Sequence, residues 1–204
     1  MYLAKIEMSM SEPPVRAALR DAQKLHRLAA GLYERSRQDA GLLYRVKMQG
    51  HAVSLYLCAQ QPIERDRLLP GMLLAGEREL SDWLASMQEG QQWSFDLLTM
   101  PFKKVPDVEG GNSRRRVLRS REERLAWLSR KAQQNGFIIL DAQESVAEKT
   151  SALHTQEKGG RLYLDVYRYS GILRILDAER FRTAVQEGIG PDKAYGLGML
   201  LLKR

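Results

Sequence analysis

The chain has 204 residues, 44% of them hydrophobic, and a formal net charge of +7. The positive charge favours a polyanionic partner, either a nucleic acid or a membrane surface. No apolar stretch approaches the roughly 20 residues that a spanning helix needs, and the start of the chain lacks the apolar segment of a signal peptide. A single cysteine, Cys58, excludes an internal disulfide, and we expect a cytoplasmic protein without membrane contact.

The first half of the chain alternates strand-like and helix-like segments. We expect strands at 1–8, 42–48, 51–59 and 72–80, a helix at 15–37 that is interrupted near Asp21, and a short helix at 62–69. Gln49-Gly50 has the residue types of a hairpin turn. The order strand, helix, strand, strand, helix, strand is typical of a ferredoxin-like module.

A second set of segments follows a connector at 81–90. We expect strands at 93–100, 137–141, 163–169, 171–176 and 198–202, and helices at 120–135 and 178–187. Ser170-Gly171 indicates a hairpin turn between two of these strands. The chain is therefore predicted to be an α+β protein of two tandem ferredoxin-like modules with antiparallel sheets, at residues 1–89 and 90–204.

Basic residues gather just before and within the predicted helix at 120–135. Arginine forks on a hairpin tipped by Gly110-Gly111 could each hold a phosphate at two points, although charged residues within the helix also fit a solvated face. The chain lacks the aromatic pattern of RNA-stacking sheets, which favours recognition of a stem by its shape. The candidate RNA-binding residues are Lys103, Lys104, Arg114, Arg115, Arg116, Arg119, Lys158, Arg161 and Lys193.

A glycine-rich segment near the end of the chain contains Gly188, Gly190, Gly196 and Gly198, with Lys193 between them. Glycine lets backbone N–H groups approach a phosphate closely, so this segment could bind one. Its spacing matches neither the dinucleotide-binding fingerprint nor the Walker A loop. A tight turn between a helix and a strand explains the same residues.

The three histidines, His26, His51 and His154, are scattered, and no cysteine or histidine cluster has zinc spacing. We therefore expect no metal and no cofactor. His26 shares a helical row with Ala22 and Ala29, at the border of the apolar face. It can be a half-buried structural residue or a general acid–base group, because the ordinary histidine pKa is near 6.5.

Six segments carry a family resemblance in order along the whole chain: residues 1–5, the Leu25-His26 helix, Phe95-x-Leu97 with Pro101-x-Lys103, the arginine segment, Leu125-Ala126-Trp127-Leu128 with Gly136-Phe137, and the glycine-rich segment 188–198. Together they resemble the CasE family, the repeat-processing endoribonucleases of type I-E CRISPR systems.

The resemblance implies a metal-independent endoribonuclease that cuts the repeat stem-loops of precursor CRISPR RNA. In such enzymes the 2′-hydroxyl of the RNA attacks and leaves a 2′,3′-cyclic phosphate, and the family's catalytic histidine corresponds to His26. The implied partners are the repeat RNA and the other Cascade subunits, with no DNA contact by the isolated subunit.

Two departures from the family pattern leave alternatives open. Gln23 stands where some relatives carry an assisting tyrosine, which leaves Lys24, Arg27 and Tyr33 as weaker candidates for a catalytic helper. The stretch 145–160 is also poor in basic residues where relatives have a basic segment. One alternative is a non-catalytic RNA-binding subunit of the same lineage. The other is an unrelated nucleotide-binding enzyme that uses the glycine-rich segment.

Overall fold

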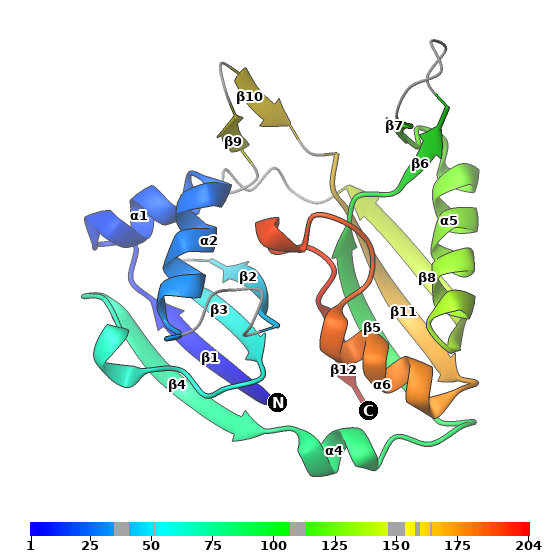
Figure 1. Cartoon of the computed structure of the whole chain (residues 1–204), viewed down its shortest axis with the longest axis horizontal. Coiled ribbons are helices and arrows are strands. Elements are labelled where there is room, and N and C mark those ends of the chain that lie inside the picture. The colour runs from blue at the N-terminus through cyan, green and yellow to red at the C-terminus, as the bar shows by residue number, and fades with distance from the viewer. Residues whose placement is uncertain (35–40, 51, 107–112, 147–153, 158–159, 164) are drawn as a thin grey trace.

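The computed structural model describes residues 1–34, 41–50, 52–106, 113–146, 154–157, 160–163 and 165–204. The first antiparallel sheet has the strand order β2-β3-β1-β4. Its strands are β1 (Tyr2–Met8), β2 (Leu43–Gln49), β3 (Ala52–Ala59) and β4 (Met72–Glu79). Helices α1 (Pro13–Leu19) and α2 (Ala22–Gly31) cover one face of this sheet (Figure 1).

The second antiparallel sheet has the order β12-β5-β11-β8. Its strands are β5 (Gln92–Thr99), β8 (Phe137–Val146), β11 (Tyr167–Ile175) and β12 (Leu200–Lys203). Helices α5 (Arg121–Gln134) and α6 (Ala178–Glu187) pack on one face of it. In both sheets the first and third strands are central and the second and fourth are at the edges. This order confirms the two predicted ferredoxin-like modules.

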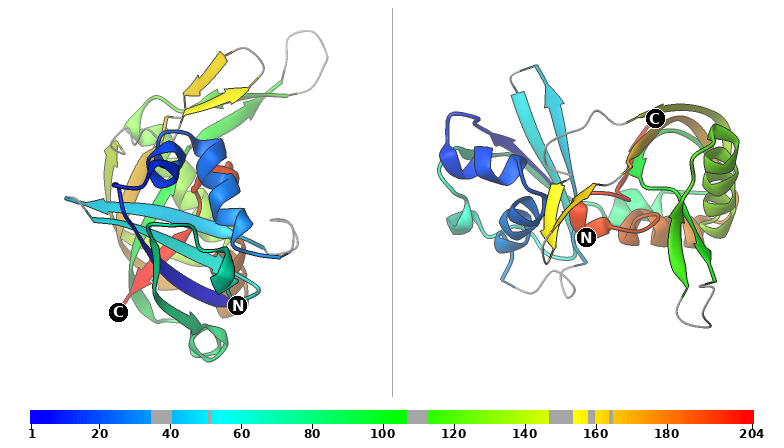
Figure 2. Two further views of the ribbon diagram at one scale, coloured as in Figure 1. Left: turned by 90° about the vertical axis from the view of Figure 1, so that its left-hand side faces the viewer. Right: turned by 90° about the horizontal axis from the view of Figure 1, so that it is seen from above.

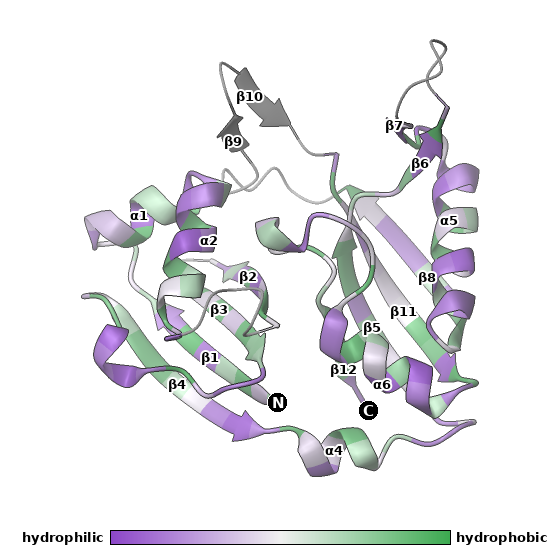
Figure 3. Cartoon of the chain, viewed as in Figure 1, coloured by the Kyte–Doolittle hydropathy of each residue, from purple (hydrophilic) through white to green (hydrophobic). Residues whose placement is uncertain are grey.

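Side chains of alternating strand residues and of one helix stripe form the core of the first module. Ile6, Leu55 and Leu57 of the sheet pack in one cluster with Leu25 and Ala29 of α2. Full burial of such an aliphatic side chain contributes about 1.5–3 kcal/mol. The hydrophobic residues lie along the strands, whereas α5 is largely hydrophilic on its outer side (Figure 3). This core fixes the position of α2 against the sheet.

Two hairpins extend beyond the sheets. One pairs β6 (Phe102–Val105) with β7 (Arg114–Val117), and the other pairs β9 (His154–Glu157) with β10 (Gly160–Tyr163). Both project from the same end of the molecule (Figures 1 and 2). The β6–β7 hairpin confirms the arginine-bearing hairpin predicted from the sequence, although its tip at 110–111 lies outside the described residues.

The predicted hairpin turn at Ser170-Gly171 is wrong. Strand β11 runs without a break through both residues and pairs with β5 on one side and β8 on the other. A Cβ atom at Gly171 would lie 2.0 Å from the carbonyl oxygen of Asp141. Glycine is therefore required here because the neighbouring strand β8 approaches closely, and it does not mark a turn. The close approach lies beside an irregularity in the β11–β8 register.

Several other boundaries differ from the prediction. The helix expected at 62–69 is only the 3-10 turn η1 (Arg65–Arg67), and the connector contains the short helix α4 (Ser81–Ala85). Strand β8 continues to Val146, and β10 and β11 replace the strand expected at 163–169. The helix expected at 15–37 is divided at Asp21 into α1 and α2, as predicted, and α2 ends at Gly31.

Residues from both sheets share contacts. Arg45 on β2 is 4% exposed and forms an ion pair with Asp96 on β5, and Arg168 Nε on β11 donates to Asp96 Oδ2 at 2.8 Å. Burial lowers the pKa of Arg45, and the nearby Asp96 carboxylate opposes this shift. Met1 and Cys58 also pack in the same cluster as residues of the second sheet. The boundary at residues 89 and 90 stays a prediction.

Candidate functional site

His26 lies on α2, at the edge of the face that this helix buries. Asp21 starts the helix: its side chain accepts hydrogen bonds from the backbone N–H groups of Gln23 at 2.8 Å and Lys24 at 3.1 Å. Leu25 and Ala22 point into the core, whereas His26 is half-buried. The helix therefore places an imidazole at the boundary between the core and solvent, where it can reach a bound ligand.

Tyr44 on β2 is the aromatic neighbour of His26. The two rings are nearly parallel, with an interplanar angle of 20° and centroids 6.2 Å apart. The Tyr44 hydroxyl donates a hydrogen bond to the carbonyl oxygen of Ala194 at 2.7 Å. Ala194 belongs to the 3-10 turn η3 (Lys193–Tyr195) within the glycine-rich segment. The structure thus brings α2, β2 and η3 together, although they are far apart in the sequence.

The glycine-rich segment packs closely against both modules. A Cβ atom at Gly188 would lie 2.9 Å from Leu43 Cδ2, and one at Gly196 would lie 3.0 Å from Tyr44 Cε2. A Cβ atom at Gly190 would lie 2.7 Å from the hydroxyl of Thr99. All four predicted glycines also have positive φ angles, which other residues rarely adopt. Close packing and backbone conformation therefore explain these glycines.

Five backbone N–H groups of this segment donate to carbonyl groups of the protein itself. The donors are Gly188, Ile189, Tyr195, Gly196 and Gly198. These N–H groups are directed at protein carbonyls, as expected for a turn between α6 and β12. Lys193 lies on η3, which contacts α2, so the structure places this lysine on an element next to the one that carries His26.

The β6–β7 hairpin presents basic side chains on both of its faces. Lys103 is paired with Arg116 and Lys104 with Arg115 in the antiparallel register, so each pair shares one face. Lys104, Arg114, Arg115, Arg116 and Arg119 are all exposed. The structure therefore gathers six of the predicted RNA-binding residues on or directly after one hairpin.

Acidic residues form ion pairs with basic residues on both faces of this hairpin. Glu123 on α5 pairs with Lys103 at 3.4 Å and with Arg116 at 3.1 Å. On the other face, Arg115 lies over the ring of Phe102, with 4.8 Å to the centroid, and its Nη1 is 3.1 Å from Asp192 Oδ1. Asp192 has a φ of 60°, so the backbone adopts the left-handed conformation to present it. The Arg115–Asp192 pair connects the hairpin to the glycine-rich segment.

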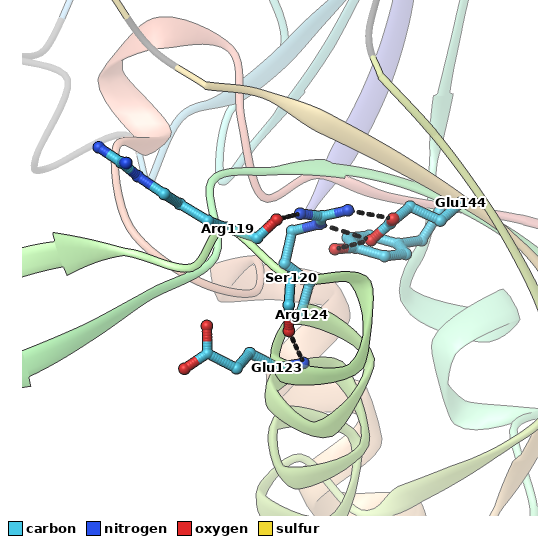
Figure 4. Close-up of polar contacts among 6 residues, drawn as sticks. Arg119, Ser120, Glu123, Arg124 and Glu144 are labelled. Carbon is cyan, nitrogen blue, oxygen red and sulfur yellow. Dashed lines mark hydrogen bonds and ion pairs between the residues drawn. The ribbon is translucent and has the colours of Figure 1, made fainter.

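Arg124 fixes the junction between β7 and α5 (Figure 4). It donates to both carboxylate oxygens of Glu144, at 2.9 and 2.7 Å, and to the carbonyl oxygen of Arg119. The Glu144 carboxylate also accepts from the Tyr169 hydroxyl at 2.9 Å. Burial alone would raise the pKa of Glu144, but the hydrogen bonds from Arg124 and Tyr169 lower it below the ordinary glutamate value. Arg124 is thus a structural residue beneath the hairpin.

The remaining predicted RNA-binding residues lie in or near the second hairpin. Lys158 is outside the described residues, and Arg161 is described only by its backbone on β10, paired with Gln156. Strand β9 contacts α2, so this hairpin lies beside the helix that carries His26. No hairpin was predicted here, although the consecutive glycines Gly159-Gly160 in the sequence are a turn signal.

Two residues of the site were not predicted. Tyr44 lies within an apolar run that looks like any core strand, and no local signal marks its contact with His26. Asp192 lies beside a proline in the glycine-rich segment, where an acidic residue is an ordinary turn residue. Among the described residues, no cluster of histidine, cysteine and acidic side chains could hold a metal ion. None of the described helices is long and apolar enough to cross a membrane.

Comparison with known proteins decides the family. The family model described as "CRISPR associated protein" matches residues 1–204. The chain belongs to this family. It is 24% identical to the CRISPR-associated endoribonuclease Cse3 of Thermus thermophilus, over 98% of both chains. It is 28% identical to the CRISPR system Cascade subunit CasE of Escherichia coli, over 99% of this chain and 98% of that relative.

A solved structure agrees with this assignment. The structure of CRISPR endoribonuclease Cse3 bound to a 19-nucleotide RNA matches the chain with a TM-score of 0.86 at 22% identity, and the match covers 100% of both chains. The resemblance to the CasE family is confirmed, and the match to this solved structure confirms the predicted α+β fold. The roles of individual residues stay predictions.

Proposed function

We propose that this CRISPR-associated protein is an endoribonuclease that cuts the repeat stem-loops of precursor CRISPR RNA. The observation that carries the proposal is the family match over residues 1–204. The site supports it, because α2, which carries His26, contacts η3 of the glycine-rich segment and the arginine hairpin is joined to that segment by the Arg115–Asp192 pair. The relatives are named as an endoribonuclease and as a Cascade subunit. We extend both roles to this chain. We also propose a cytoplasmic location, where the protein would encounter the precursor RNA.

The proposed reaction is an internal transfer of a phosphoryl group. The 2′-oxygen attacks the adjacent phosphorus and loses its proton, the bond from phosphorus to the 5′-oxygen breaks, and that oxygen receives a proton. The products are a 2′,3′-cyclic phosphate and a 5′-hydroxyl. His26 serves as the base or the acid, and Lys193 stabilises the charge that develops on the phosphorane oxygens.

The burial of the residues near His26 bears on the choice of a second proton carrier. Tyr33 is 4% exposed, and burial, with smaller contributions from Cys58 and Glu77, raises the pKa of its phenol further. It is therefore unsuited to proton transfer near neutral pH. Lys24 and Arg27 are exposed on α2, and Gln23 is half-buried. Lys24 and Arg27 remain candidates to assist His26 through their charge.

The chemistry of the products tests this proposal. The repeat RNA should yield fragments that end in a 2′,3′-cyclic phosphate, identified by mass spectrometry. An RNA with a 2′-deoxy nucleotide at the cleavage position should bind and remain intact, because it lacks the nucleophile. Cleavage of that deoxy substrate at the normal rate would show that the nucleophile is not the 2′-hydroxyl.

The alternative of a non-catalytic RNA-binding subunit is favoured by Gln23, which replaces the assisting tyrosine of some relatives. It predicts tight binding of the repeat without cutting. The nucleotide-binding alternative is weakened by the glycine-rich segment, because five of its N–H groups are bonded to the protein's own carbonyls.

Replacing Arg115, Arg116 and Arg119 together with alanine is expected to weaken repeat-RNA binding. The slope of log affinity against log salt is negative, and each lost phosphate contact should reduce its magnitude by about 0.7–0.9, so the magnitude should fall by about two units or more. Titrations from low to moderate salt measure it. The matched control replaces Arg65, Arg174 and Arg180, exposed arginines outside the hairpin, and the same net charge is lost. Equal effects in both variants would contradict a specific role of the hairpin.

Replacing Asp192 with asparagine is expected to strengthen RNA binding. Asparagine tolerates the positive φ at this position, and the change frees Arg115 for a phosphate. The negative slope of log affinity against log salt should become steeper by up to about one unit. Asp66→Asn, at an exposed position in η1, removes the same charge elsewhere and should have little effect. Weaker binding of the Asp192 variant would show that the ion pair helps to form the site.

A further inference from the structure

Tyr44 is the point where three elements of the site meet. Its side chain is fully buried on the helix-covered side of β2. One ring face is stacked on His26 of α2, and the ring edge lies so near Gly196 that a Cβ atom there would come within 3.0 Å. Its hydroxyl donates to the carbonyl oxygen of Ala194 in η3. One side chain therefore contacts both α2 and the glycine-rich segment.

We propose that Tyr44 is a positioning residue that sets the orientation of the His26 imidazole relative to η3, and hence to Lys193. This inference rests on the proposed function of His26. Two features of Tyr44 carry it, the nearly parallel ring at 6.2 Å and the hydrogen bond at 2.7 Å. The ring limits the rotation of the imidazole, and the hydrogen bond fixes the turn that follows Lys193.

The geometry separates this role from that of a catalytic residue. The Tyr44 hydroxyl is buried, and its proton is directed to the Ala194 carbonyl, so it does not reach the RNA. It acts by holding two other groups. An in-line attack requires the proton carrier and the charge-stabilising cation to be placed together, and a displacement of about 1 Å can lower a rate by about 10²-fold.

Two substitutions divide the contributions of Tyr44. Tyr44→Phe keeps the ring on His26 and removes the hydrogen bond to η3. Tyr44→Leu removes both. The matched control is Tyr33→Phe, because Tyr33 is a buried tyrosine in the same core cluster. Single-turnover cleavage at saturating protein measures the rate, titration measures RNA affinity, and thermal unfolding identifies variants that do not fold.

The expected rate falls by about 10-fold in Tyr44→Phe and by about 10²-fold in Tyr44→Leu, with RNA affinity nearly unchanged. Tyr33→Phe should cut at the parental rate. Proton NMR adds a second measurement, because a ring stacked on an imidazole shifts the imidazole resonances upfield. This shift of His26 should persist in Tyr44→Phe and disappear in Tyr44→Leu.

Parental cleavage rates in folded Tyr44→Phe and Tyr44→Leu would overturn the proposal. An equal loss of rate in Tyr33→Phe would also overturn it, because the effect would then belong to the core in general. If the parental protein does not cut the repeat, the proposed function fails separately. In that case the His26 resonances still test whether Tyr44 orients the imidazole. An unchanged shift of these resonances in Tyr44→Leu would overturn the role proposed for Tyr44.

Discussion

Replacing His26 with alanine is expected to lower the single-turnover rate of repeat-RNA cleavage by about 10²–10⁴-fold, the usual contribution of one general acid or base. RNA affinity should stay close to parental, because the phosphate contacts are assigned to the β6–β7 hairpin. His26 is half-buried at the edge of the α2 core face, so thermal unfolding must be measured on the same variant. The rate is measured with labelled repeat RNA and protein in excess.

The matched control for this variant lies on the same helix. In Gly31→Ala the added methyl group meets no other atom within 4 Å, so α2 should be undisturbed and the cleavage rate parental. If His26→Ala folds, binds the repeat and cuts at the parental rate, His26 is structural. The alternative of an RNA-binding subunit would then be preferred, unless another proton carrier were found.

Replacing Glu144 with alanine is expected to lower the free energy of unfolding by about 3–5 kcal/mol, because it leaves Arg124 buried without its ionic partner. The Arg124 side chain is 10% exposed and that of Glu144 is 6% exposed. The hydroxyl of Tyr169 also loses its acceptor. Denaturant unfolding measures the change. In the control Arg180→Ala, which breaks an exposed pair with Asp177, the change should be within about 1 kcal/mol.

The same ion pair gives a pH dependence of stability. Hydrogen bonds from Arg124 and Tyr169 hold the folded-state pKa of Glu144 below its ordinary value, so the contribution of this carboxylate to stability is complete above the ordinary carboxyl pKa and is lost as the pH falls through the folded value. The difference in stability between the parental protein and Glu144→Gln should therefore shrink on acidification below about pH 4. A constant difference over this range would show that the charge of Glu144 contributes nothing.

The sequence predicted most of the strands and helices of both sheets because turn residues separate them, but the helix expected at 62–69 is only the turn η1. It failed at Gly171, where a glycine required by a close strand looks the same in the sequence as a glycine in a turn. It also missed the β9–β10 hairpin, whose strands are short and polar. Local patterns report the conformation of a segment, but they do not report which distant strand approaches it.

The candidate site was predicted only in part for the same reason. The position of His26 at the border of an apolar helix face follows from helical periodicity, and the arginine hairpin follows from charge and flanking glycines. The contact of His26 with Tyr44, and that of Arg115 with Asp192, join residues far apart in the sequence. The first contact depends on how α2 packs against β2, and the second on how the β6–β7 hairpin approaches the glycine-rich segment. Only the hydrogen bond from Tyr44 to Ala194 depends on how the two modules meet.

The most direct test of the account is the incubation of purified protein with a labelled repeat RNA in excess EDTA. We predict cutting at one position by the parental protein, and binding without cutting by His26→Ala. Tight binding of the repeat by the parental protein without any cutting, with or without added divalent metal, would contradict the assignment as an endoribonuclease.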